Sequence, residues 1–256
     1  MRQVVAAFSR TMKEFLREKA ALFWTLIWPI IWVLIGSTTF TASVPADTRP
    51  YANAAFTVSM MVFALMMAGM TNLPSTITQD RENGMLSKLI SMPISPRKEF
   101  IGRILALATF SAIATGLVIA VGVASGARFS STAQVGPAIG FLVLVVAASA
   151  GLGLIIGTVI KRQHGAIMTG VGISVISASI SGMFAPYEFL PPALQRFARI
   201  YPISSASNLV RYFIIGEEFA DYNPLGTGQV TLTIALSLLL LILGINLYSR
   251  LSWRSE

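Results

Sequence analysis

Six long stretches of the chain contain no Asp, Glu, Lys or Arg, and this feature limits the possible folds most strongly. The stretches are residues 20–46, 50–79, 104–127, 129–160, 163–187 and 222–249. Each is longer than the roughly 20 residues that a helix needs to cross the hydrocarbon core of a bilayer. Backbone amides that face lipid must be paired within their own segment, so helices are the expected form. The sequence therefore predicts an all-α, polytopic membrane protein.

Six transmembrane helices fit within these stretches, in one domain that covers residues 1–256. The predicted helices are residues 20–41, 53–73, 104–125, 137–158, 165–185 and 228–248. Charged residues make up only 12% of the chain, against about 25% in soluble domains, which agrees with this class. The chain contains no Cys, which excludes disulfides and thiolate metal sites.

The distribution of basic residues predicts the orientation of the helices. With both termini in the cytoplasm, fourteen of the nineteen Lys and Arg residues lie on the cytoplasmic side, as the positive-inside rule requires. The outer segments carry five basic residues, Arg49, Arg128, Arg196, Arg199 and Arg211. They are balanced by five acidic residues, Asp47, Glu188, Glu217, Glu218 and Asp221. Contact with anionic lipid headgroups thus explains the net charge of +8, and nucleic acid is not expected as a partner.

Two amphipathic helices are predicted on the cytoplasmic side. Residues 1–19 combine apolar and basic residues at helical spacing, which is typical of a helix on the inner leaflet. Between the second and third spans, a helix is predicted over residues 79–91, which the following Pro93 ends. Its apolar side consists of Met85, Leu86, Leu89 and Ile90. Such a side must be covered by membrane or by a partner protein.

The segment after the fifth predicted span contains two short apolar pieces. Pro191 and Pro192 can open a first helix, and a second piece runs from Leu209 to Ile214. Both pieces are too short to span a bilayer. Residues 186–216 are therefore expected to form re-entrant or surface-lying helices on the outer side.

Two rows of side chains in the spans are candidates for a substrate pathway. The second span carries soft apolar residues at helical spacing, namely Phe56, Met60, Phe63 and Met67. Such a row suits varied apolar substrates, but packing between helices or contact with lipid produces the same row. The fifth span carries the hydroxyl groups of Ser174, Ser177 and Ser181. This row fits a wet pathway or a close contact between helices, and both interpretations stay open.

Small residues four positions apart are a further signal of helix packing. Two such pairs lie in or next to the fourth span, Gly136 with Gly140 and Gly153 with Gly157. This spacing lets two helix backbones approach closely, but it is common by chance in glycine-rich spans.

The sequence lacks the groups that membrane enzymes and ion-coupled carriers generally need. The predicted spans contain no Asp, Glu, Lys, Arg or His for binding a coupling ion, and the single histidine, His164, lies at a helix boundary. One histidine in that position offers no pairing of a nucleophile with a base. The phosphate-binding pattern GxxxxGK[ST] is absent as well. We therefore expect no catalytic residue, no metal site and no cofactor bound by this chain.

Two segments resemble the permease subunit of type-2 ATP-binding-cassette exporters. The first is QDRENGMLSKLISMPISPRKEFIGR, with an acidic-Asn-Gly turn, an apolar helix, a Pro and a basic run into the third span. The second is SGMFAPYEFLPPALQRFARIYPISSASNLVRYFIIG, which is similar to the outer re-entrant helices of the family. The resemblance covers nearly the whole chain. It favours the drug and antibiotic branch, because the residues before the first predicted span lack the basic, Tyr-containing run with which the saccharide exporters usually begin.

The resemblance implies roles for particular residues. Residues 1–19 would form the elbow helix, and residues 79–91 would form the coupling helix that docks on a separate ATPase subunit. The residues that would make this contact are Arg81, Glu82, Asn83, Gly84, Met85, Leu86 and Leu89. An Asn-Gly pair favours a sharp turn, and the apolar side would fill a groove in the partner. An interfacial helix that lies on lipid explains the same pattern.

The resemblance also implies a function. ATP and Mg would bind to the ATPase partner, and the permease would pair with a second copy or a paralogue among the lipids of a prokaryotic plasma membrane. The expected task is export of an amphipathic or hydrophobic compound, as in multidrug efflux or antibiotic resistance. Two alternatives stay open. One is a secondary transporter, which the missing ionisable groups and the lack of an inverted repeat disfavour, and the other is a membrane assembly protein that transports nothing.

Overall fold

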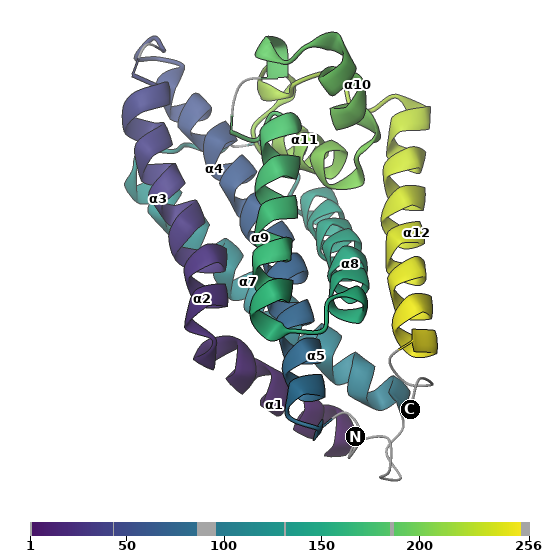
Figure 1. The fold of residues 1–256 in the computed structure, drawn as a ribbon. Helices are drawn as coiled ribbons and strands as arrows, with labels where there is room; N and C mark the ends of the chain where they lie inside the picture. The colour runs from purple at the N-terminus through teal and green to yellow at the C-terminus, as the bar shows by residue number, and fades with distance from the viewer. Residues whose placement is uncertain (1, 43, 86–95, 131, 185–186, 252–256) are drawn as a thin grey trace.

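Helices account for the whole architecture of the computed structural model, which describes all residues except 1, 43, 86–95, 131, 185–186 and 252–256. The described residues contain no strand. In Figure 1, α1 (Arg2–Arg17) and the last turn of α12 (Thr227–Leu251) lie at one end of the bundle, which we call the base. The other end, the top, carries α10 (Pro192–Ile200) and α11 (Pro202–Ile214). The predicted all-α class is confirmed.

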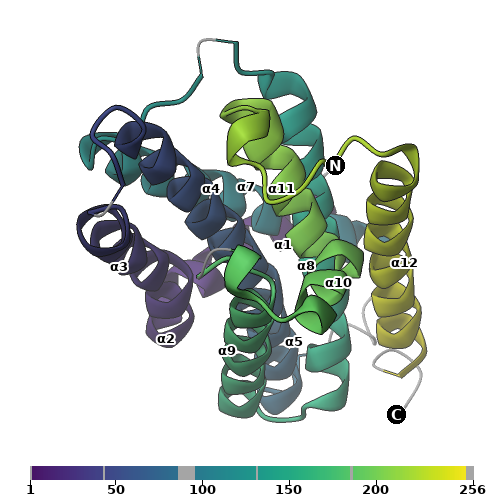
Figure 2. The same ribbon diagram turned by 90° about the horizontal axis from the view of Figure 1, so that it is seen from above.

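The remaining helices run between the base and the top. The first long stretch consists of α2 (Lys19–Leu22), η1 (Phe23–Ile27), α3 (Trp28–Ile35) and η2 (Gly36–Phe40). The second consists of α4 (Arg49–Met67), η3 (Ala68–Asn72) and α5 (Leu73–Glu82). They are followed by α7 (Pro96–Ala124), α8 (Val135–Val159) and α9 (Gln163–Ile180), and two short turns, η4 (Tyr187–Phe189) and η5 (Glu217–Phe219), lie at the top. Figure 2 shows α3 and α12 on opposite sides of the bundle.

Five helical stretches are long and apolar enough to cross a membrane. They are Lys19–Phe40, Arg49–Glu82, Lys98–Ala124, Val135–Val159 and Gly228–Arg250. Each overlaps one of the predicted spans. Helix α9, which corresponds to the predicted span at 165–185, has 18 residues and is not among them, although it packs along α5 and η3. A membrane protein is therefore confirmed, and the sixth span stays a prediction.

A proline usually marks the end of a helix, yet two prolines lie inside long helical stretches of this structure. Pro74 follows the π-helical turn η3, and Pro29 follows the π-helical turn η1. Proline lacks an amide hydrogen, and its ring clashes with the carbonyl of the preceding turn. A wider turn before the proline relieves that clash. The second helical stretch consequently runs past its predicted end at residue 73 to Glu82, at the base.

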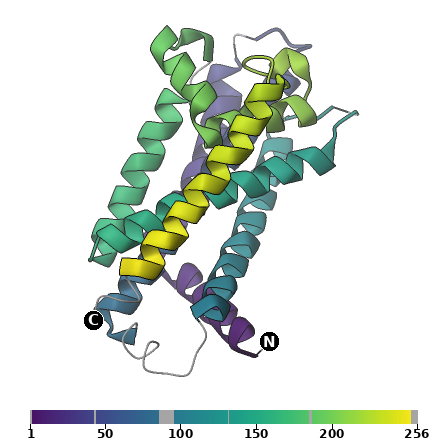
Figure 3. The same ribbon diagram turned by 90° about the vertical axis from the view of Figure 1, so that its right-hand side faces the viewer.

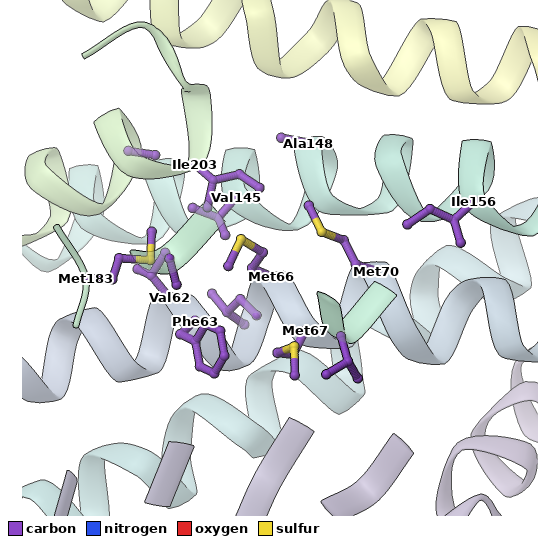
Figure 4. Close-up of a cluster of buried hydrophobic side chains, with 14 of the residues drawn as sticks. Val62, Phe63, Met66, Met67, Met70, Val145, Ala148, Ile156, Met183 and Ile203 are labelled. Atoms are coloured by element: carbon purple, nitrogen blue, oxygen red, sulfur yellow. The ribbon is translucent and has the colours of Figure 1, made fainter. Parts of the chain in front are cut away.

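The second stretch forms the core of the bundle. In its apolar part 89% of the residues are buried, whereas in the corresponding part of the last stretch 17% are buried. Figure 4 shows Met66 and Met70 directed toward Val145 and Ala148 of α8. Because this helix is enclosed and close-packed, any shift of it repacks its neighbours.

Candidate functional site

Helix α5 ends at the base in a tight turn. The Gly84 amide donates to the Arg81 carbonyl over 3.1 Å, and the Asn83 amide donates to the Gln79 carbonyl over 2.9 Å. Gly84 has a φ of 64°, in the left-handed region that glycine adopts without strain. A sharp turn is thus present where the Asn-Gly pair favours one.

The seven residues predicted to contact an ATPase divide into three groups. Arg81 donates from Nη1 to the carbonyls of Gly157 (3.3 Å) and Ile160 (3.2 Å) near the end of α8. Glu82 accepts from the Gln163 amide over 3.3 Å. These two side chains therefore brace α5 against the connection between α8 and α9. Asn83, Gly84 and Met85 form the second group and are exposed, as is Glu82, and the group outside the described residues consists of Leu86 and Leu89.

The helix predicted over residues 79–91 begins differently in the structure. Residues 79–82 are the last turn of α5, and the Asn-Gly turn separates them from Met85. The difference arises because the helix continues through Pro74 instead of ending there. Residues 86–95 lie outside the described part, so the rest of the coupling helix stays a prediction.

Five charged side chains meet at the base, and we call them the charge cluster. They are Arg10, Glu14, Asp80, Glu99 and Arg103. The first two come from α1, the third from α5 and the last two from the start of α7. Figure 3 shows α1 beside the lower end of α7. The charge cluster therefore joins three helices that are distant in sequence.

Arg103 lies at the centre of the charge cluster, with only 1% of its surface exposed. Its Nε donates to Glu99 Oε1, and its Nη2 donates to Asp80 Oδ2. The remaining Nη1 donates to Thr76 Oγ1 over 3.1 Å. Each of the three guanidinium nitrogens is therefore paired, as a fully buried arginine requires.

Arg10 ties α1 to this network. Its Nη2 donates to Asp80 Oδ2, the same oxygen that Arg103 contacts, and its Nε lies 3.1 Å from Glu14 Oε1. Burial raises the pKa of Glu14 above its usual value; Asp80 and Glu99 add to the rise, whereas the two arginines oppose it. The carboxylates outnumber the arginines here, so the network depends on both cations.

A second set of polar contacts holds the other side of α5. Gln163, at the start of α9, donates from Nε2 to Glu18 Oε2 over 2.8 Å and to Ser75 Oγ over 3.1 Å. Ser75 belongs to α5, and Glu18 lies between α1 and α2. Together with the charge cluster, these contacts fix the lower end of α5 to α1, α7 and α9.

A polar cavity of about 230 Å³ opens beside these contacts. Its walls include Glu14, Glu18, Asp80, Asn83 and Met85. The exposed turn after α5 therefore borders the charge cluster directly. Although three carboxylates face this cavity, no group of His, Cys, Asp or Glu in the described part of the chain is arranged to hold a metal ion.

Helix α1 packs into the bundle as well as covering its base. Phe15 is 1% exposed, and its ring meets that of Phe110 edge-on, with the centroids 5.6 Å apart. A Cβ atom added to Gly102 would lie 2.5 Å from Ala7 Cβ, so α1 and α7 touch closely. This helix covers residues 2–17 of the 1–19 predicted for the elbow, and the elbow role itself stays a prediction.

The residues predicted to line a pathway lie mostly inside the bundle. Six of the seven are buried, namely Met60, Phe63, Met67, Ser174, Ser177 and Ser181. Ser174 donates to Met70 Sδ over 3.2 Å, which joins α9 to η3. Phe56 differs from the others, since it lines a cavity at the top. Within one chain the two rows therefore serve contacts between helices.

The sequence predictions missed the charge cluster, because its members fall outside the predicted spans. One signal was present: Glu99 and Arg103 are four residues apart, the spacing of an ion pair on a helix. The contacts of Asp80 with Arg10 and Arg103 have no such local spacing. They depend on the continuation of the second helix past Pro74.

Comparison with known proteins identifies the family. The model of the ABC-2 type transporter family matches residues 2–215, from the start of α1 to just past the end of α11. A search of curated proteins finds no match. The family match includes the charge cluster, the turn after α5, the first segment that carries the resemblance and all but the last residue of the second. Since it covers most of the 256 residues, the chain belongs to the ABC-2 type transporter family.

Proposed function

We propose that the chain is the permease subunit of an exporter and that a separate ATPase subunit, which binds ATP and Mg, docks at its base. Family membership supports a transmembrane transporter subunit with an ATP-binding-cassette partner. In this proposal the base faces the cytoplasm, because most of the basic residues belong to segments at that end. The protein is then a multi-pass protein of a prokaryotic plasma membrane, and the cargo leaves at the top.

One observation carries the proposed coupling: a continuous helical stretch joins the base to the top through the core. Arg49–Glu82 has 34 residues, which at 1.5 Å per residue gives a length of about 50 Å. Its lower end leads through the turn at Gly84 into the segment predicted to dock. The charge cluster fixes the same end to α1 and α7. In the proposal, movement of the docked segment therefore reaches the core directly.

The proposed cargo is an amphipathic or hydrophobic compound, such as a drug or an antibiotic. The apolar cavity beside Phe56 supports this class, because pockets for such ligands are mainly apolar with few polar groups. We place the pathway between this chain and a second copy or a paralogue. The reason is that the core around Met60, Phe63 and Met67 is close-packed within one chain.

Leu86→Glu tests the docking segment. The added carboxylate is expected to lower both co-purification with the ATPase and substrate-stimulated ATP hydrolysis in liposomes by at least about tenfold, because a charge facing an apolar groove loses its hydration. Leu86→Met is the matched control. It is expected to leave both co-purification and ATP hydrolysis unchanged, since methionine has a similar volume and polarity. Unchanged co-purification of Leu86→Glu would contradict docking through this segment.

The alternatives make different predictions. A secondary transporter would keep exporting its cargo after the ATPase gene is deleted, with the proton gradient as its energy source. An assembly protein would bind partners but give no cargo-stimulated ATP hydrolysis in liposomes. Our proposal requires cargo movement that stops when the ATPase is removed and when its nucleotide site is inactivated.

A further inference from the structure

A groove of about 540 Å³ lies between α7 and α8, in the part of the bundle that crosses the membrane. Figure 3 shows these two helices spreading apart toward the base. Leu65 of α4, which is 2% exposed, forms the floor of the groove. Leu241 of α12 adds a residue from a further membrane span.

The lining of the groove is apolar almost throughout. Of its fourteen residues only Ser111 and Thr115 carry a polar side chain, and none carries a charge. Water is not favoured in a space that offers it so few polar partners. Every lining residue belongs to a helical stretch that is apolar enough to cross the membrane, so the medium outside the groove is hydrocarbon.

The groove is long and narrow. Its lining residues on α7 recur at every turn from Phe100 to Thr115, which at 1.5 Å per residue gives a length of roughly 22 Å. Spread over this length, the volume corresponds to a mean cross-section of about 25 Å². A helix about 10 Å across needs roughly 80 Å², so the groove admits a single extended chain and excludes a helix of a second copy.

Small side chains create this space. Ala108 and Ala112 line it from α7, and Ala147 and Ala150 line it from α8. Larger residues at these positions would bring the two helices into contact through their side chains. An empty space of this kind loses dispersion contacts along both walls, and a flexible hydrocarbon chain restores them.

The lower end of the groove lies at the level of lipid headgroups. Phe100 follows Glu99 of the charge cluster, at the base. Lys98, two residues before Phe100, is exposed, and so is Arg250 at the base end of α12. Basic side chains at this level attract the phosphate groups of lipids. Charge at the end of the groove and hydrocarbon along its length therefore match the two parts of a phospholipid.

We propose that the groove binds one acyl chain of a phospholipid from the cytoplasmic leaflet, with the phosphate group at the level of Lys98. This lipid is distinct from the cargo, and only its leaflet rests on the proposed function, in which the base faces the cytoplasm. The hydrocarbon of one leaflet is about 15 Å thick, half of the bilayer core, so a chain that enters at the base reaches along most of the groove.

Native mass spectrometry tests the proposal. The purified chain is washed extensively in a mild detergent, and the phospholipid molecules retained per chain are counted. The wild type is expected to retain one. Ala112→Phe places a ring in the groove and is expected to lower the retained fraction by at least about tenfold. Ala112 is exposed, so the ring needs no repacking of the core.

Ala120→Phe is the matched control. It adds the same ring to an exposed position of α7 that does not line the groove, and it is expected to retain lipid as the wild type does. Ala147→Phe fills the groove from α8 and is expected to lose the lipid as Ala112→Phe does. Elution profiles and unfolding temperatures show that each variant is folded.

A photoreactive phospholipid locates the chain directly. With a diazirine midway along its acyl chain, it is expected to label residues 100–115 and 139–150 of the washed wild type. Absence of a retained phospholipid from the wild type, labelling elsewhere, or equal retention by Ala112→Phe and Ala120→Phe would overturn the proposal. So would a wild-type dimer that Ala112→Phe converts to monomers without a change in bound lipid. The experiment uses neither ATPase nor cargo, so its failure is distinct from failure of the exporter function.

Discussion

Arg103→Met is expected to lower the stability of the protein by about 3–5 kcal/mol, the usual cost of removing one partner from a buried ion pair. The side chain is 1% exposed and donates to Glu99, Asp80 and Thr76. After the substitution both carboxylates remain buried without their central cation. Methionine fills much of the aliphatic volume, so the loss reports mainly the missing charge. Thermal unfolding in a mild detergent, followed by tryptophan fluorescence, measures the effect.

Two further variants separate charge from packing in this experiment. Arg103→Lys keeps the charge but cannot reach three acceptors with a planar fork, so an intermediate loss is expected. Arg10→Met removes a cation whose side chain is 28% exposed, and solvent screening makes the expected loss smaller. A wild-type unfolding temperature for Arg103→Met would show that the charge cluster does not hold the base together.

The fold class follows from the sequence because a bilayer imposes one requirement on every span. Each must be long, free of charge and paired within its own backbone, and local composition records this requirement directly. The family was predictable for a similar reason, since the two segments that carry the resemblance are continuous in sequence. Both predictions need only the order of residue types along the chain.

Helix ends were harder to predict, because they depend on backbone geometry that residue types do not determine. Pro74 normally argues for a helix end, yet the π-helical turn before it lets the helix continue to Glu82. At the start of α9, Gln163 and His164 reduce the apolar character of a short helix. Composition alone therefore does not decide whether α9 crosses the bilayer.

The charge cluster and the cavity at the top could not be predicted, because their pairs join distant positions. Asp80 meets Arg103 only because α5 extends to the base, where α7 begins. The outer segments contain five arginines and five acidic residues, but these counts do not show that Arg211 pairs with Asp221 at the top. Charge counts give the side of the membrane, whereas the choice of partner needs the packed helices.

Gly153→Leu is expected to destabilise the bundle by about 3 kcal/mol or more, because the new side chain has no room. A Cβ atom at this position would lie 2.0 Å from the Gly69 carbonyl oxygen and 3.3 Å from Pro74 Cδ. The obstacle is backbone of the core helix, which cannot move without repacking its neighbours. A lower unfolding temperature and reduced yield of monodisperse protein are the measured results.

Gly140→Leu is the matched control for Gly153→Leu, since both glycines lie on α8 and both belong to small-residue pairs of the same spacing. A Cβ at Gly140 would meet no atom within 4 Å among the described residues. Leucine favours helix over glycine, so this variant is expected to be at least as stable as the wild type. The spacing is identical and only the facing backbone differs. Equal losses in the two variants would therefore mean that α8 does not pack against η3 at Gly153.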